Sequence, residues 1–314
     1  MIPQQQRAMT PVEWGLLLFL SLLWGASFFF VGVIVKELPP LTIVALRVAI
    51  AALALWVTGP LTGVSLARIR SAAASLLLMA VFNNVLPFSL LVWAQTKLPS
   101  GFAAILNAST PLLTVLAAHV LTTSEKLTPM RMAGAALGLA GVAWMVGPDL
   151  SSGLSGSFLA ELACVLAAAF YALSSIFGRR FSGLGLKPID IATGQLSAAS
   201  LVLIPAALFV DHPWALAAPS MSTVAAIIAF ACFSTALAYI VFFRILAGAG
   251  ATNVGLVTLL VPVTTIALGA LALGERLELR HFVGLALIAA GLAFIDGRLP
   301  RRLSHALGIA PAPV

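Results

Sequence analysis

Residues 101–147, GFAAILNASTPLLTVLAAHVLTTSEKLTPMRMAGAALGLAGVAWMVG, decide the fold because the chain contains a second version of them. That version, TNVGLVTLLVPVTTIALGALALGERLELRHFVGLALIAAGLAFIDG, covers residues 252–297. Solenoid proteins repeat roughly every 20 to 50 residues, whereas these copies stand about half a chain apart. We therefore expect a duplicated half-protein, with halves at residues 1–150 and 151–314. The matching residues are Pro111 with Pro262, Glu125 with Glu275, Gly134 with Gly284, Gly141 with Gly291, and Gly147 with Gly297.

The composition places the chain in a membrane. Of its 314 residues, 61% are hydrophobic and 9% are charged, and the mean hydropathy is +1.10. No soluble fold of this length buries that much apolar surface. A membrane helix needs about 20 apolar residues, so we predict an all-α integral membrane protein with ten transmembrane helices and no soluble domain. The expected spans are residues 12–35, 41–59, 71–94, 99–122, 129–147, 157–178, 188–210, 221–245, 250–273 and 280–297.

The basic residues predict the orientation, because cytoplasmic loops of membrane proteins are rich in Lys and Arg. With a cytoplasmic N-terminus, four basic residues fall on the external side, namely Lys36, Lys97, Arg276 and Arg280, and twelve on the cytoplasmic side. Both termini are thus expected in the cytoplasm. The net charge of +7 follows this rule and does not indicate a nucleic-acid partner. The twelve are Arg7, Arg68, Arg70, Lys126, Arg131, Arg179, Arg180, Lys187, Arg244, Arg298, Arg301 and Arg302.

The number of spans in each half determines how the two copies lie in the membrane. Five crossings bring the second half into the membrane from the opposite side, so we predict two inverted-topology five-helix repeats. Inverted repeats are typical of secondary carriers, in which one repeat rocks against the other around a site near the membrane centre. Weaker matches that fit the same duplication are Trp24 with Tyr171, Ser27 with Ser174, and Arg47 with Gln195.

Several segments resemble one family of transporters. WGASFFFVGVIV (24–35), ALRVAIAALAL (45–55) and LGERLELRHFVGLALIAAGLAFIDG (273–297), with the proline-containing fourth and ninth spans, resemble the EamA-type branch of the drug/metabolite transporter (DMT) superfamily. The resemblance covers nearly the whole chain and implies the same ten-span architecture. It also implies export or exchange of small metabolites such as amino acids, or of drug-like compounds, across the inner membrane. Neighbouring branches carry sugars, nucleotide sugars and phosphorylated trioses, so the substrate stays open.

Three mid-span prolines, Pro87, Pro111 and Pro262, predict breaks in their helices that expose polar backbone groups inside the membrane. Proline has no N–H group, so the carbonyl four residues before it loses its helical donor. In all three cases that residue is polar. We predict that the three polar residues, extended by Asn84, line one cavity near the membrane centre; the alternative is that each caps its own kink or bonds a neighbouring helix. The pairs are Asn83 with Pro87, Asn107 with Pro111, and Thr258 with Pro262.

Other side chains are candidates for the same site. Trp24, Tyr171 and Tyr239 suit a pocket that accepts aromatic groups by stacking. Arg47, the one basic residue clearly inside a span, predicts either an anchor for a substrate carboxylate or phosphate or a side chain that snorkels to the external surface. Its counterpart Gln195 is uncharged. The substrate-binding candidates are therefore Trp24, Ser27, Arg47, Asn83, Asn84, Asn107, Tyr171, Gln195, Tyr239 and Thr258.

Motifs for other classes of protein are absent from the sequence. It contains no Walker A motif, no H-E-x-x-H and no paired intramembrane aspartates, and Cys164 and Cys232 lack the spacing of a metal site. We expect no enzyme activity, no cofactor and no metal ion. Glu161 and Asp190 are the acidic candidates for proton coupling, although a helix cap or ion pair is the favoured interpretation of each.

Together these features predict a secondary transporter that exports amino acids or related polar and aromatic compounds by alternating access. A channel or a lipid-translocating protein is the main alternative, and an intramembrane enzyme a weaker one. The expected partners are a small-molecule substrate and the lipid bilayer. Glycines in the fifth and tenth spans predict close helix packing, within a monomer or in a weak homodimer.

Overall fold

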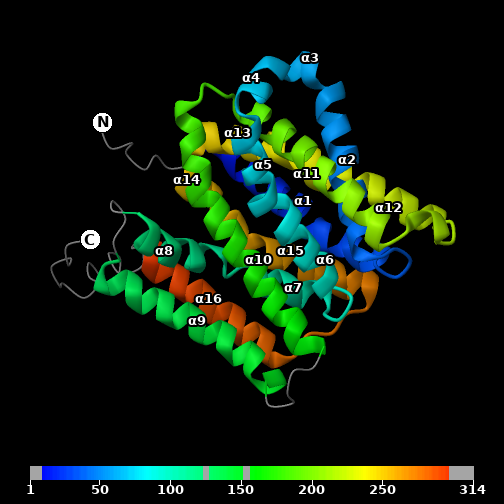
Figure 1. Cartoon of the computed structure of the whole chain (residues 1–314). Helices are drawn as coiled ribbons and strands as arrows, with labels where there is room; N and C mark the ends of the chain where they lie inside the picture. The colour runs from blue at the N-terminus through cyan, green and yellow to red at the C-terminus, as the bar shows by residue number, and fades with distance from the viewer. Residues whose placement is uncertain (1–8, 123–126, 151–155, 297–314) are drawn as a thin grey trace.

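The computed structural model describes residues 9–122, 127–150 and 156–296, and every regular element in these ranges is a helix (Figure 1). Eight helical stretches in them are long and apolar enough to cross a membrane. Two further apolar stretches, Val257–Leu273 and Leu279–Ile295, are shorter. The predicted all-α membrane architecture is confirmed in outline, whereas the count of ten spans stays a prediction.

The first half of the chain supplies five of the eight long stretches. Helix α1 begins after Thr10, whose hydroxyl accepts from the Glu13 N–H group while the Glu13 carboxylate accepts from the Thr10 N–H group; this is a capping box. The elements are α1 (Pro11–Ile34), α2 (Pro40–Val57), α3 (Gly59–Thr62), α4 (Leu66–Ser71), α5 (Ala73–Ala80), η1 (Val81–Val85), α6 (Leu86–Ala94), α7 (Ser100–Asn107), α8 (Thr110–Leu121) and α9 (Pro129–Leu150).

The second half supplies three long stretches and the two shorter ones. The expected span at 250–273 is interrupted, because the chain turns at Gly255 and Leu256 and the helix starts again at Val257. The elements are α10 (Gly156–Gly178), η2 (Arg179–Gly183), α11 (Pro188–Val210), η3 (Pro213–Ala215), α12 (Met221–Ala231), η4 (Cys232–Leu237), α13 (Ala238–Ala249), α14 (Ala251–Val254), α15 (Val257–Leu268), η5 (Gly269–Leu273) and α16 (Leu279–Asp296).

Helices α9 and α16 lie side by side along one edge of the molecule and touch through glycines (Figure 1). A Cβ atom at Gly134 would lie 2.6 Å from the Gly291 carbonyl oxygen, and one at Gly141 would lie 2.8 Å from the Gly284 carbonyl oxygen. There is no space for a side chain at these points, so the backbones meet directly. The order of the contacts makes the helices antiparallel, and the predicted packing of the fifth and tenth spans is confirmed within the monomer.

Helices α2 and α11 also run antiparallel and are joined near both ends. Asp211, just beyond α11, accepts hydrogen bonds from the N–H group (2.6 Å) and the hydroxyl (2.8 Å) of Thr42 in α2. At the other end Asp190 accepts from the Ser65 N–H group (2.8 Å) and from Arg68 Nε (2.6 Å). Asp190 therefore serves as a helix cap and ion-pair partner, which is the favoured interpretation of this carboxylate.

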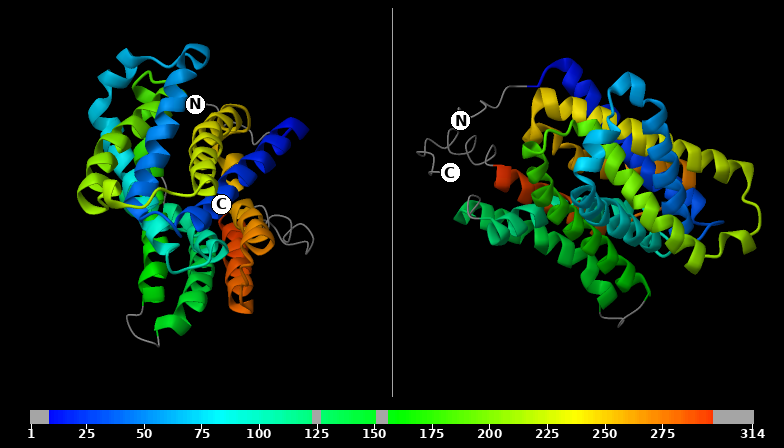
Figure 2. Two further views of the ribbon diagram at one scale, coloured as in Figure 1. Left: turned by 90° about the vertical axis from the view of Figure 1, so that its right-hand side faces the viewer. Right: turned by 45° about the horizontal axis from the view of Figure 1, so that its top comes forward.

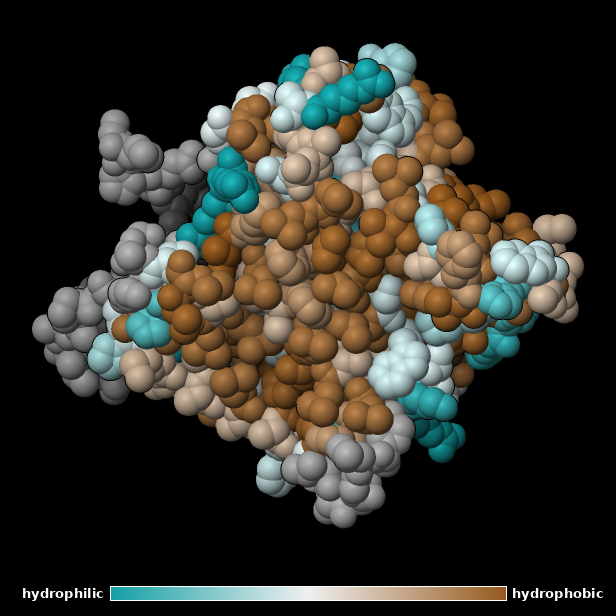
Figure 3. Space-filling model, viewed as in Figure 1, coloured by the Kyte–Doolittle hydropathy of each residue, from teal (hydrophilic) through white to brown (hydrophobic). Residues whose placement is uncertain are grey.

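The helices of the two halves interleave instead of forming separate bodies (Figure 2). Helix α1 packs parallel to α15, where the Thr264 hydroxyl donates to the Ser21 carbonyl (2.8 Å) and the Thr265 hydroxyl donates to the Gly25 carbonyl (3.2 Å). Apolar side chains cover most of the face seen in Figure 3, and polar ones collect along its rims. Such a face suits contact with lipid.

Candidate functional site

Two of the long helical stretches widen into π-helical turns. The first is η1 (Val81–Val85), which is followed by Pro87. Because proline has no N–H group, it cannot donate to the carbonyl of Asn83, and the predicted irregularity lies where expected. The second is η4 (Cys232–Leu237), where the Thr235 hydroxyl donates to the Phe230 carbonyl (3.1 Å), five residues earlier. Turns of this kind are frequent at functional sites.

Asn83 stands at the centre of a hydrogen-bond network, the Asn83 network, that joins four helical stretches. Its Nδ2 donates to Gln195 Oε1 on α11 (3.1 Å) and to the Tyr239 hydroxyl on α13 (3.2 Å). Its Oδ1 accepts from Ser174 Oγ on α10 (3.0 Å). Asn84 Nδ2 also donates to the Tyr239 hydroxyl (3.3 Å). Asn84, Ser174 and Gln195 are buried. Four of the predicted residues, Asn83, Asn84, Gln195 and Tyr239, therefore meet inside the bundle.

Arg47 points into the bundle and not towards the external surface. It is 8% exposed, and its guanidinium carbon lies 3.5 Å from the ring centroid of Phe88 and 4.4 Å from that of Phe230, distances typical of cation–π contacts. Its Nε donates to the Thr235 hydroxyl (3.0 Å). Among the described residues its other two nitrogens have no hydrogen-bond partner and no carboxylate pairs with it. The snorkelling interpretation is therefore wrong, and donors remain for a ligand.

The two halves supply matching parts of this site. Asn83 and Asn84 in η1 stand 151 positions before Ser234 and Thr235 in η4. Arg47 on α2 bonds Thr235, while its repeat counterpart Gln195 on α11 bonds Asn83. Each half thus offers a polar side chain to the widened turn of the other half. These polar groups therefore lie across the boundary between the two halves of the chain.

The remaining aromatic candidates lie around this centre. The Tyr171 ring meets the Phe88 ring edge to face at a centroid distance of 6.4 Å, which connects it to Arg47. The Trp24 ring lies 5.6 Å from that of Phe242. Ser27 is half-buried on α1, and its hydroxyl bonds to none of the described residues. Tyr171 thus lies close to Arg47, and Trp24 is connected to Tyr239 of the Asn83 network through the rings of Phe242 and Phe243. No hydrogen bond between described residues joins Ser27 to that network.

Hydrogen bonds between described residues do not connect Asn107 and Thr258 to Asn83, with which they are predicted to share a polar cavity. Asn107 Oδ1 is buried without a partner in this part of the chain, and the Thr258 hydroxyl donates to the carbonyl of Gly255 (2.8 Å). Neither side chain bonds to Asn83. That these three residues share one cavity stays a prediction.

Pro111 and Pro262, which follow Asn107 and Thr258 by four residues, differ in their effect on the helix. Pro111 follows a true break, since α7 ends at Asn107 and α8 begins at Thr110. Pro262, in contrast, lies inside α15. The prediction that Pro262 breaks its helix is wrong, because membrane helices tolerate a proline when neighbouring groups satisfy the freed backbone. The interruption comes earlier, at Gly255.

Four residues of the site were missed: Phe88, Ser174, Phe230 and Thr235. Ser174 and Thr235 carried a usable signal, because they are the repeat counterparts of Ser27 and Asn84. Phe88 and Phe230 are ordinary apolar residues of membrane helices, and only the position of the Arg47 side chain shows their role.

Chemically, this arrangement offers binding groups. It presents one cation, three amide side chains, a phenol hydroxyl and aromatic ring faces. In the described part of the chain, no cluster of three or more His, Cys, Asp or Glu side chains is placed to hold a metal ion. The groups suit a small molecule with an anionic end and a polar or aromatic part.

The Tyr239→Phe variant tests whether the network shapes this site. Loss of the hydroxyl leaves the amide donors of Asn83 and Asn84 with one acceptor fewer, which costs about 1–3 kcal/mol when the donors are buried. If a substrate uses the network, we expect KM to rise roughly tenfold with little change in kcat. Ser175→Ala is the matched control, because the Ser175 hydroxyl is exposed and bonds its own helix. An unchanged KM in Tyr239→Phe would argue against the network.

Comparison with known proteins identifies the family to which the chain is similar. The profile of the EamA-like transporter family matches residues 13–147 and again residues 158–296. The chain is 27% identical to "Uncharacterized inner membrane transporter YedA" of Escherichia coli K12, over 90% of this chain and 89% of the relative. It is 26% identical to "Probable amino-acid metabolite efflux pump" of the same organism, over 88% and 92%. A solved crystal structure, 20% identical, superposes with a TM-score of 0.65 over 93% of this chain and 98% of the other, which supports the fold.

Proposed function

Because the chain belongs to the EamA-like transporter family, and so to the drug/metabolite transporter superfamily, we propose that it is a secondary carrier that exports amino acids or related polar and aromatic metabolites by alternating access. The family and the many apolar helices indicate a multi-pass transporter of the inner membrane. Direction, substrate and mechanism are the proposed part.

The proposed architecture is ten spans in two inverted halves, residues 1–150 and 151–314. The two shorter helical stretches complete the count as spans nine and ten. The antiparallel pairs α2–α11 and α9–α16, and the parallel pair α1–α15, are the directions that an inverted duplication requires. Both termini then lie on the same side, which the excess of Arg and Lys assigns to the cytoplasm.

One observation carries the proposed site: the buried guanidinium of Arg47 has no carboxylate partner among the described residues. A buried cation is costly unless an anion or other polar groups compensate it. Two aromatic rings and one hydroxyl compensate it in part. A substrate carboxylate would complete the compensation and could bind the free nitrogens in a bidentate manner.

The Asn83 network supplies the second part of the site. Its amide and hydroxyl groups bind an ammonium or another polar group, and Tyr171 and Phe88 offer ring faces to an aromatic side chain. An aromatic amino acid carries all of these features. The names of two relatives as probable amino-acid metabolite efflux pumps support the same substrate class.

Reconstituted vesicles test the proposed function. We expect uptake of at least one labelled amino acid into proteoliposomes to saturate and to show counterflow, because a carrier exposes its site to one side at a time. Empty liposomes and vesicles with heat-denatured protein are the controls. Flux that rises linearly with concentration would indicate a channel, and movement of labelled phospholipid a lipid-translocating protein. Repeating the assay with and without a pH gradient tells whether protons are coupled.

A further inference from the structure

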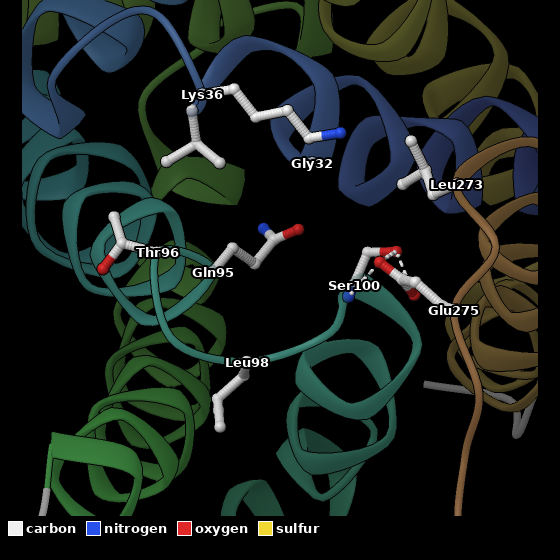
Figure 4. A pocket seen from close by; sticks show the side chains of 9 residues that line it. Gly32, Lys36, Gln95, Thr96, Leu98, Ser100, Leu273 and Glu275 are labelled. Atoms are coloured by element: carbon white, nitrogen blue, oxygen red, sulfur yellow. Dashed lines mark hydrogen bonds between the residues drawn. The ribbon is translucent and has the colours of Figure 1, made fainter.

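A pocket opens between the two halves, away from Arg47 and the Asn83 network, at the ends of α1, α6 and η5 and the start of α7 (Figure 4). Its volume is about 400 Å³, within the roughly 300–1,000 Å³ typical of small-molecule sites. No residue of the Asn83 network lines it, and neither does Arg47. It is therefore distinct from the proposed substrate site. Its lining includes Gly32, Lys36, Gln95, Ser100, Leu273 and Glu275.

Gln95 extends from the end of the α6 stretch into this pocket (Figure 4). The residue is 8% exposed, and its Nε2 makes a long contact of 3.5 Å with the Leu91 carbonyl. Its Oε1 has no hydrogen-bond partner in the described part of the chain. A buried acceptor without a donor is destabilising. The oxygen therefore calls for an N–H or O–H donor that this part of the chain does not supply.

The charges around Gln95 define what kind of donor fits. The Glu275 carboxylate lies on the far wall and accepts from the Ser100 N–H group (2.8 Å), the Ser100 hydroxyl (2.8 Å) and the Gly101 N–H group (3.2 Å). It thereby occupies the N–H groups at the start of α7, so an anion cannot bind there. Its negative charge favours a cationic donor beside it. An ammonium group between Gln95 and Glu275 satisfies both.

Lys36 supplies the opposite charge at the other rim. Its side chain is exposed, extends along the pocket (Figure 4), and bonds to none of the described residues. Its ammonium group is available to a carboxylate or another anion. A positive rim and a negative wall within one pocket of this size match a molecule that carries both charges.

We propose that this pocket binds a small zwitterion, a free amino acid in its simplest form, with its ammonium group on Gln95 Oε1 and Glu275 and its carboxylate towards Lys36. Binding does not depend on transport; only the pocket's role as a second station on the transport path rests on the proposed function. The carrier then holds two zwitterion sites, one at Arg47 and one at Gln95.

Equilibrium binding of labelled glycine to the full-length, detergent-purified Arg47→Gln variant tests the second site alone. We expect saturable binding, at least tenfold weaker after Gln95→Leu and after Lys36→Gln. Lys97→Gln is the matched control, because Lys97 lies two residues after Gln95, is exposed and does not line the pocket. This variant should bind glycine as the Arg47→Gln parent does. Glycine betaine, whose nitrogen has no N–H group, should compete at least tenfold less well than glycine.

Several outcomes would overturn the inference. They are no glycine binding to the Arg47→Gln parent, equal binding by Lys36→Gln, and equal competition by betaine. If Gln95→Leu does not fold, as judged by its melting temperature, the Lys36 variant and the betaine comparison decide. Glycine binding that depends on Lys36 in a protein that transports nothing in vesicles would support this site and contradict the proposed function.

Discussion

Replacing Arg47 with glutamine is expected to lower the kcat/KM of amino-acid transport in proteoliposomes by roughly 100-fold while the protein still folds. Removing one partner of a buried, hydrogen-bonded charge pair costs about 2–5 kcal/mol, and each 1.4 kcal/mol is about tenfold. The glutamine keeps a hydrogen-bond donor for the Thr235 hydroxyl but brings no charge for a substrate carboxylate. The measurement is the initial rate of labelled uptake at several substrate concentrations.

Two further variants separate the roles of charge and shape at Arg47. Arg47→Lys keeps the charge but loses the planar, bidentate donor group, so we expect it to fall between wild type and Arg47→Gln. Arg70→Gln is the matched control, because Arg70 is exposed in the short helix α4, and it should transport as wild type does. If Arg47 only binds Phe88 and Phe230 in a structural contact, Arg47→Gln will lower the melting temperature and leave KM unchanged. That result would remove Arg47 from the site.

The helices could be predicted closely because their signals are local. The expected segment 188–210 coincides with α11 (Pro188–Val210), where a long apolar run begins at a proline. The break in the expected segment 250–273 is harder to predict, because the turn at Gly255 and Leu256 lies within a mostly apolar segment. Composition reports the length of a span, whereas a break within it depends on backbone packing.

The site residues could be predicted as types but not as partners. Polar residues inside a span are costly and therefore conspicuous, which is how Asn83, Gln195 and Arg47 stand out in the sequence. Whether Asn83 bonds Gln195 depends on the position of α11 along its neighbouring helices, and no local sequence pattern specifies that position. The same limit explains Asn107, which obeys the proline rule as Asn83 does but has no bond to the Asn83 network.

The repeat itself contained more information than the proline rule. Aligning the third and eighth spans at 151 positions pairs Asn83 with Ser234, Asn84 with Thr235, and Phe88 with Tyr239. The turn is π-helical in both copies, η1 and η4, although a proline follows only η1. The widened turn is therefore a property of the duplicated unit, and the proline is one way of stabilising it.

The duplication also predicts where the molecule tolerates no added atom. Gly134→Ala is expected to lower the melting temperature in detergent by several degrees, because the new Cβ atom would lie 2.6 Å from the Gly291 carbonyl oxygen and 2.9 Å from Phe294 Cβ. A backbone oxygen cannot move without shifting α16, and overpacking of this kind typically costs about 1–3 kcal/mol. Adding Gly141→Ala, whose Cβ atom would lie 2.8 Å from the Gly284 carbonyl oxygen, should separate α9 from α16 and remove most of the folded protein.

Gly147→Ala is the matched control within α9, because a Cβ atom built there meets no described residue within 4 Å beyond its own stretch of helix. Alanine is the better helix former by about 1 kcal/mol, so this variant should melt at or above the wild-type temperature. Equal melting temperatures for Gly134→Ala and Gly147→Ala would show that α9 and α16 do not pack through their glycines. A loss confined to Gly134 and Gly141 would instead place the contact at the two points where the backbones of α9 and α16 meet. Transport by the single variants would then report whether α9 and α16 must stay together while the rest of the bundle changes access.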